Sequence, residues 1–240
     1  MRYDDVLELL KSIKKDFTHL TSTCEKGRFN EDLNLPPVLL KNILENSRSC
    51  LEYIAADAYE SIPNHTPGKV LFFPYGPSLH DLMKINRNKW LADLNKYRPD
   101  LFSEIINYQD FNLHQDNSWL VEFCKLNNKI KHNSLSRPIR KGLNEKFEIA
   151  PGIVISSEAK KVTFSDSQIN GQKLKNLIIE GGQNSSKIQK TINDAGLNFK
   201  VRYSSSGVEF LTDNGINVIS LMNRTIKNIE QLTNEFYKKL

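Results

Sequence analysis

The sequence predicts an α+β protein in which a helical bundle is interrupted by an antiparallel β insert before the last helix. Three observations lead to this fold class. Apolar residues recur at helical spacing up to about residue 146, alternate with period two over residues 147–213, and form a single helical stripe over residues 214–240. The last helix is expected to return to the bundle, because a helix of that length needs a partner surface.

The first two helices are predicted from apolar periodicity and from proline. The first runs from about Tyr3 to Leu20 and is followed by a polar link. Pro36-Pro37 then opens the second, because proline is tolerated in the first turn of a helix. This second helix extends to about Glu60 and carries a continuous inner stripe, formed by Leu40, Ile43, Leu44, Ser47, Cys50, Leu51, Ile54 and Ala58.

A long loop with four prolines is predicted over residues 61–86, where the apolar piece Val70 to Phe73 covers the bundle as an extended segment. Asn86 or Asn88 is expected to cap a short helix that contains Trp90. Pro99-Asp100 ends that helix and starts another.

The helix from Trp119 to Ser134, which Asn117 or Ser118 is expected to cap, is the most informative stretch of the chain. It is amphipathic and turns polar and basic towards its C-terminal end. Asn128 and His132 lie four positions apart, so they share one helical face. Lys125, Lys129 and Lys131 surround them. A His beside an amide and cations can perform acid–base chemistry or bind an anion, and the same residues can equally form a helix end turned to water.

The β insert is predicted from five segments of period-two alternation that Gly, Ser, Asn and Asp divide. They cover residues 147–156, 161–169, 174–181, 198–204 and 207–212, and the last two are expected to pair as an antiparallel hairpin. Ser185 to Ala195 is predicted as a short helix that Gly196 ends. Asp213 or Asn214 is expected to cap the final helix.

Composition excludes several classes of protein. The 240 residues are 39% hydrophobic and contain no apolar run near the length that a membrane helix needs, and the N-terminal stretch is acidic where a signal peptide is basic, so a cytoplasmic protein is expected. The three cysteines are far apart and form no CxxC pair, so neither a disulfide framework nor a zinc site is predicted. Cys50 and Cys124 are expected in the core. No P-loop or GxGxxG is present, and no metal or cofactor is expected.

Positive charge is concentrated in one segment. Residues 121–147 contain seven Lys and Arg against two Glu, an excess equal to the net charge of +5 of the whole chain. A clustered positive field attracts phosphate, although a solvated connector has the same composition. Arg48 lies in the middle of an otherwise apolar helix, where an unpaired charge is costly. It is expected either to pair with Glu45, Glu52 or Asp57 or to face the edge formed by Asn128 and His132.

Three features together resemble one family: the helix SRSCLEYIAADAY, the Phe73-Pro74 pair in the loop, and the helix end L-N-N-x-x-K-H-N. They are similar to HEPN-like (higher eukaryotes and prokaryotes nucleotide-binding) bundles, and the similarity covers about residues 1–146 and 214–240. The resemblance implies a protein that binds or cleaves RNA without metal, in a bacterial stress, toxin–antitoxin or anti-phage defence system, and a homodimer.

The ribonuclease members of that family have an Arg that precedes a His by a few residues. His132 and Asn128 match the His and its polar companion, so the resemblance implies catalysis by these two residues and phosphate binding by Lys125, Lys129, Lys131 and Arg48. The motif Arg is absent, since Asn127 and Lys125 occupy its two slots. A catalytically silent interaction or adaptor subunit, whose β insert recognises a partner protein, is the second hypothesis.

Overall fold

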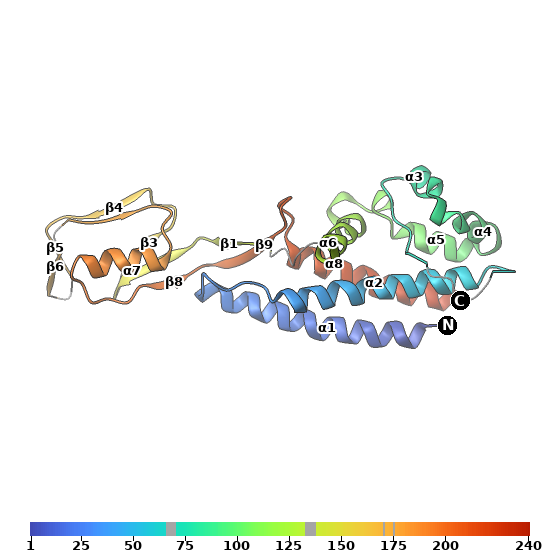
Figure 1. The fold of residues 1–240 in the computed structure, drawn as a ribbon, viewed down its shortest axis with the longest axis horizontal. Coiled ribbons are helices and arrows are strands. Elements are labelled where there is room, and N and C mark those ends of the chain that lie inside the picture. The colour runs from blue at the N-terminus through green and yellow to red at the C-terminus, as the bar shows by residue number, and fades with distance from the viewer. Residues whose placement is uncertain (66–70, 133–137, 170, 175) are drawn as a thin grey trace. The chain divides into compact units, whose positions relative to one another are not determined.

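The computed structural model describes residues 1–65, 71–132, 138–169, 171–174 and 176–240, without the side chains of Gln115, His132, Ile169, Lys173 and Leu174. The described residues form a mixed α and β fold, which confirms the predicted α+β class (Figure 1). Their eight α-helices are α1 (Tyr3–Lys26), α2 (Pro37–Glu60), α3 (Leu79–Lys84), α4 (Trp90–Tyr97), α5 (Pro99–Asn107), α6 (Leu120–His132), α7 (Ser185–Asp194) and α8 (Val218–Lys239). Their strands are β1 (Ile139–Leu143), β2 (Lys146–Ala150), β3 (Ile153–Ser156), β4 (Lys161–Phe164), β5 (Ser167–Ile169), β6 (Gln172–Leu174), β7 (Leu177–Glu180), β8 (Arg202–Ser204) and β9 (Gly207–Leu211). Among these helices, none combines the length and apolar character that crossing a membrane requires.

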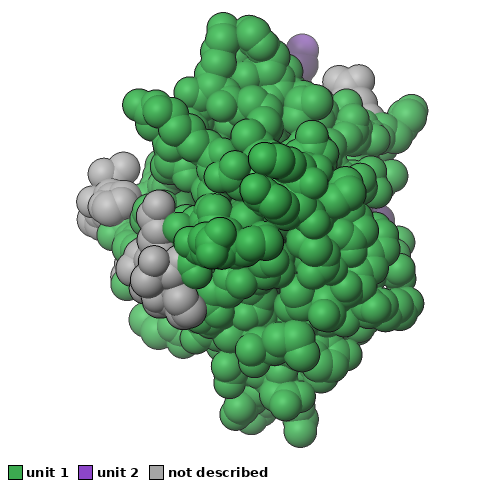
Figure 2. All heavy atoms as spheres, turned by 90° about the vertical axis from the view of Figure 1, so that its right-hand side faces the viewer, with its two compact units in different colours: residues 1–20, 36–137, 216–240 green, residues 21–35, 138–215 purple. Residues whose placement is uncertain are grey.

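The chain divides into two compact units. Unit 1 comprises Met1–Leu20, Pro36–Arg137 and Ile216–Leu240, and Figure 2 shows one of its faces in green. Unit 2 comprises Thr21–Leu35 and Pro138–Gly215. The β part therefore begins before the predicted residue 147, because β1 pairs along its whole length with β9. It also includes the segment that the sequence presented only as a polar link.

The first two helices of unit 1 follow the predicted pattern, with one difference in length. α2 begins at Pro37 and ends at Glu60, and the whole predicted stripe of α2 is buried. α1 continues to Lys26, beyond the predicted end at Leu20, because neither Gly nor Pro interrupts the polar stretch before Gly27. Cys50 and Cys124 are buried, as expected.

Two predictions for the segment before α4 are wrong. The predicted loop over residues 61–86 contains α3, whose first turn is capped by Ser78, because the Ser78 Oγ accepts the N–H of Asp81 over 3.1 Å. Asn88 does not cap α4. It is buried, and its side-chain amide donates to the carbonyl of Leu82 over 3.0 Å.

One buried carboxylate joins three helical ends of unit 1. Asp57, in the last turn of α2, is 3% exposed. It accepts hydrogen bonds from the backbone N–H of Arg2 (2.7 Å), from Nη1 of Arg2 (2.6 Å) and from the hydroxyl of Tyr237 near the end of α8 (2.7 Å). Burial and this carboxylate raise the pKa of Tyr237, so the phenol remains a donor.

The final helix returns to the bundle, where α8 packs against α2, α5 and α6. Its cap is Asn217, whose side-chain oxygen accepts the N–H of Ser220 over 3.1 Å, so the prediction of Asp213 or Asn214 is wrong by three or more residues. The apolar stripe of α8 faces the interior of the bundle, where Met222, Ile229 and Phe236 are buried.

The strands of unit 2 pair antiparallel in four small sheets, β1–β9, β3–β2–β8, β4–β7 and β5–β6. The predicted hairpin between residues 198–204 and 207–212 is wrong, because β8 pairs with β2 and β9 pairs with β1. The chain changes partner at the serines between them. The N–H of Ser205 donates to the carbonyl of Arg28 and that of Ser206 to the carbonyl of Leu143, each over 2.8 Å, so neither is left for a hairpin ladder.

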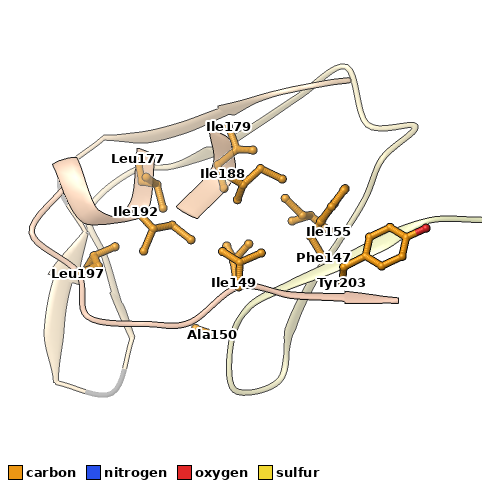
Figure 3. Close-up of a cluster of buried hydrophobic side chains, with 11 residues drawn as sticks. Phe147, Ile149, Ala150, Ile155, Leu177, Ile179, Ile188, Ile192, Leu197 and Tyr203 are labelled. Carbon is orange, nitrogen blue, oxygen red and sulfur yellow. The ribbon is translucent and has the colours of Figure 1, made fainter. Parts of the chain in front are cut away.

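The core of unit 2 forms between α7 and the sheets (Figure 3). Ile188 and Ile192 project from α7 towards Phe147, Leu177 and Ile179 of the strands. α7 ends as predicted at Gly196, which has a φ of 75° and accommodates the left-handed turn that closes a helix. The insert thus has a hydrophobic core of its own.

Replacing Asp57 with Ala should destabilise the protein by about 1–3 kcal/mol, because the Tyr237 hydroxyl and the backbone N–H of Arg2 would lose their acceptor, while the Arg2 guanidinium would keep its pair with Glu60. Urea unfolding followed by circular dichroism measures the change. Glu230→Ala is the matched control, since it breaks the more exposed pair between Lys14 and Glu230 (2.5 Å) and should cost less than about 1 kcal/mol. Equal losses in the two variants would contradict a central role for Asp57.

Candidate functional site

The predicted site residues occupy the C-terminal half of α6. Cys124, Asn128 and His132 follow one another at intervals of four residues, so their backbone positions form one stripe along the helix. Asn128 is exposed, whereas the neighbouring Asn127 is 5% exposed. The side chain of His132 lies outside the described residues, as does the predicted helix end at Ser134.

The three predicted lysines differ in their surroundings. Lys125 is exposed and donates to Glu122 over 2.7 Å, so part of its charge is neutralised within α6. Lys129 is half-buried and Lys131 is exposed. These side chains give the end of α6 a positive edge, but the lysines on their own do not form an enclosed site.

α6 is held in place by an aspartate from an earlier turn. Both carboxylate oxygens of Asp110 accept backbone N–H groups at the start of the helix, from Trp119 (2.8 Å), Leu120 (3.0 Å) and Val121 (2.9 Å). Asp110, rather than the predicted Asn117 or Ser118, therefore caps α6. A carboxylate at this position satisfies unpaired donors and also interacts favourably with the helix dipole.

Arg48 forms the ion pair that was one of its two predicted roles, while a contact with the edge formed by Asn128 and His132 stays a prediction. Its Nε donates to Glu52 over 3.0 Å, which selects one of the three predicted acidic partners. Its Nη1 reaches Cys124 Sγ over 3.0 Å and so contacts α6 one turn before Asn128. With 13% of its side chain exposed, Arg48 is the inner member of the candidate site.

A second arginine and two aromatic rings complete what we call the arginine–aromatic cluster, which consists of Arg48, Phe72, Tyr75 and Arg87. The Arg48 Cζ lies 5.9 Å from the centroid of the Phe72 ring and 5.6 Å from that of Tyr75. The corresponding distances for Arg87 are 5.9 and 5.8 Å. Both guanidinium groups thus share the same two rings, at the range of cation–π attraction.

The extended segment between residues 71 and 75 points Phe72 outward. Leu71 and Phe73 are buried and Phe72 is 47% exposed, which is the alternation of an extended chain. Gln109 fixes the segment by donating from Nε2 to the carbonyl of Pro74 over 2.9 Å. The predicted extended cover is present here, although Val70 lies outside the described residues.

The cluster carries more positive than negative charge. Glu52 pairs with Arg48, while Arg87 is exposed and has no carboxylate partner among the described residues. Burial raises the pKa of the Cys124 thiol to about 11 even though both arginines act in the opposite direction, so the thiol is neutral. Within the described residues, the site therefore presents a guanidinium without a paired carboxylate beside an exposed ring.

This arrangement suits a ligand that has both negative charge and flat rings. Guanidinium groups bind phosphate, and an exposed aromatic ring stacks on a base. In the part of the chain that the structure describes, no group of three or more His, Cys, Asp or Glu side chains could hold a metal ion. The chain matches no protein-family model, no curated protein and no solved structure.

Sequence reasoning found Arg48 and missed its companions. Phe72 and Tyr75 lie in the loop predicted over residues 61–86, Arg87 follows it directly, and none of the three was predicted as a site residue. Period-two alternation from Leu71 to Phe73 was a usable signal, because it places Phe72 on the opposite face from two buried neighbours. Nothing in the sequence indicated that Arg87 would meet the same rings.

Replacing Asp110 with Ala should cost about 1–2 kcal/mol of stability, because three N–H groups at the start of α6 would lose their acceptor. Urea unfolding measures the loss. Asp116→Ala removes a carboxylate that is 89% exposed in the same region and should change stability by less than about 0.5 kcal/mol. If Asp110→Ala behaves like Asp116→Ala, the cap does not position α6.

The cysteines should alkylate slowly in the folded protein at pH 8. Burial is the main cause that raises the pKa values of Cys24 and Cys124 to about 11 and that of Cys50 to about 12, and only the thiolate reacts. Iodoacetamide labelling read by mass spectrometry should be at least about 100-fold slower than in urea. The rate at Cys124 should rise as the pH approaches 11. Fast labelling of Cys124 at pH 8 would show that α6 opens readily.

Proposed function

We propose that this protein is a HEPN-like RNA-binding protein that holds single-stranded RNA at the arginine–aromatic cluster. The observation that carries the proposal is the convergence of two guanidinium groups on two rings, one of which is exposed. Arg87, which pairs with no carboxylate in the described part of the chain, supplies a charge for a phosphate. Phe72 supplies a stacking surface, and an unpaired base can reach such a surface while a base within a duplex cannot.

The basic end of α6 extends this surface. Arg48 contacts α6 at Cys124, and the exposed Asn128 lies one turn further along the same stripe. Lys125 and Lys131 add exposed positive charge beside that stripe. An RNA strand that stacks on Phe72 would therefore find further phosphate contacts along the helix, and such contacts are favoured in low salt.

Arg48 also supports the catalytic form of this proposal. Arg48 would supply from α2 the motif Arg that is absent from α6; its guanidinium contacts the stripe at Cys124, two turns before His132, and would have to exchange Glu52 for the phosphate. His132 would then act as general acid–base on the ribose hydroxyl or the leaving oxygen, without a metal ion. Incubation of RNA with the protein in EDTA, beside His132→Ala, tests this step, and cleavage is expected only from the wild-type protein.

Binding to a labelled oligouridylate at several salt concentrations tests the RNA site independently of cleavage. Arg87→Ala should weaken binding and reduce the salt slope by about 1, because one phosphate contact is lost. Phe72→Ala should weaken binding by about 1–3 kcal/mol and leave the salt slope unchanged, because a stacked base releases no counterion.

Two matched variants control for the loss of a surface charge or ring. Arg202 has a side chain that is 76% exposed, and Phe29 is 71% exposed, and both lie in unit 2. Arg202→Ala and Phe29→Ala should bind RNA as the wild-type protein does. Equal effects of the cluster variants and the control variants would reject the cluster as the RNA site.

A further inference from the structure

A polar cleft of about 470 Å³ lies in unit 1 between the end of α5, the segment before α6 and the middle of α8. Side-chain amides dominate its lining, and five contribute: Asn107, Asn117, Asn223, Asn228 and Gln231. None of them belongs to the arginine–aromatic cluster. The RNA-binding proposal therefore leaves this cleft without a role.

Most of the hydrogen-bonding capacity of these amides is unused within the described residues. The Asn228 amide donates to the carbonyl of Arg224 over 2.9 Å, and its oxygen remains as an acceptor. The side chains of Asn107, Asn223 and Gln231 make no hydrogen bond to another described residue, and all three are exposed. Each such amide offers both a donor and an acceptor to a ligand.

The cleft also has a positive charge that its own walls do not neutralise. Arg224 donates from Nη1 to the carbonyl of Asp116 over 3.4 Å, and neither Arg224 nor Lys227 pairs with a carboxylate among the described residues. The one acidic side chain of the lining, Glu104, is bound to Lys239. A ligand with carboxylates would be attracted to this field.

The amides complement a peptide main chain in their chemistry, and two of them with one lysine complement it in their spacing. Each peptide unit has one N–H donor and one C=O acceptor, which a side-chain amide can satisfy together. Asn223, Lys227 and Gln231 recur every four residues on α8, a rise of about 6 Å. Alternate residues of an extended chain recur at about 6.6 Å. The two repeats are similar enough for about four residues of an extended peptide to lie opposite these three side chains.

Nucleic acid fits the cleft less well. Tyr108 is its only aromatic lining residue among those described, and it is half-buried rather than presented as a stacking surface. Stacking contributes much of the affinity for single strands, and here it would be missing. We infer that the cleft binds a short, extended, acidic segment of a partner protein, with the amides paired to its main chain and Arg224 and Lys227 paired to its carboxylates.

The test uses the intact 240-residue chain and an array of acetylated, amidated hexapeptides with Asp or Glu at alternating positions. The tightest peptide is then made again with N-methylated backbone amides, which removes main-chain donors and keeps every side chain. Binding should fall about 10-fold or more on N-methylation, because several hydrogen bonds are lost together. Asn223→Ala and Gln231→Ala should each weaken binding by about 3- to 10-fold.

Asn234→Ala is the matched control, because Asn234 is an exposed asparagine of α8 outside the cleft, and it should bind as the wild type does. Three results would overturn the inference: no hexapeptide binds below millimolar concentration, the N-methylated peptide binds equally well, or Asn223→Ala matches Asn234→Ala. Oligouridylate binding that falls in Asn223→Ala would also overturn it, by assigning the cleft to RNA. Unchanged peptide binding in Phe72→Ala, together with its loss of RNA binding, is the result expected if the cleft and the arginine–aromatic cluster are separate sites.

Discussion

The helical unit depends on a charge that is almost fully removed from water. Asp57 joins the residue before α1, the last turn of α2 and the end of α8, which are separated by most of the sequence. A buried carboxylate is tolerated only when its partners are complete, and here Arg2 and the Tyr237 hydroxyl provide them. This hydrogen bond joins the helix that follows the insert to a helix that precedes it, because Tyr237 reaches Asp57 only when α8 packs on the bundle.

Hydrogen bonds from polar side chains also hold the backbone segments that form the candidate site. Gln109 is fully buried and holds the segment that presents Phe72, while the adjacent Asp110 caps α6. Two neighbouring residues thus fix the two elements that Arg48 connects, the segment 71–75 through the rings of Phe72 and Tyr75 and α6 through Cys124. An exposed aromatic ring and an exposed arginine make few contacts that fix their positions. Because the backbone that carries the ring is fixed, less conformational entropy is lost when a ligand binds.

The sequence predicted the regular parts of this fold because each rests on local signals. The stripe of α2, the proline that opens α5 and the glycine that ends α7 act within a few residues of their own positions. Contacts between residues that are far apart in the sequence could not be predicted in this way. The cap of α6 and the partners of β8 and β9 depend on groups that are distant in the sequence, so Asp110 could not be distinguished from Asn117 by spacing alone.

The candidate site shows the same division between local and distant information. Arg48 was identified because a charge within an apolar helix must have a partner, but Arg87 and Phe72 acquire their role only when three segments meet.

In the proposed function the two arginines would also differ in what they contribute. Arg48 is mostly buried and already paired with Glu52, so its geometry is fixed and little of its charge is available. Arg87 is exposed and has no paired carboxylate among the described residues, so it can move onto a phosphate without first breaking a salt bridge. The inner arginine would therefore set the position of the site, and the outer arginine would supply most of the electrostatic attraction.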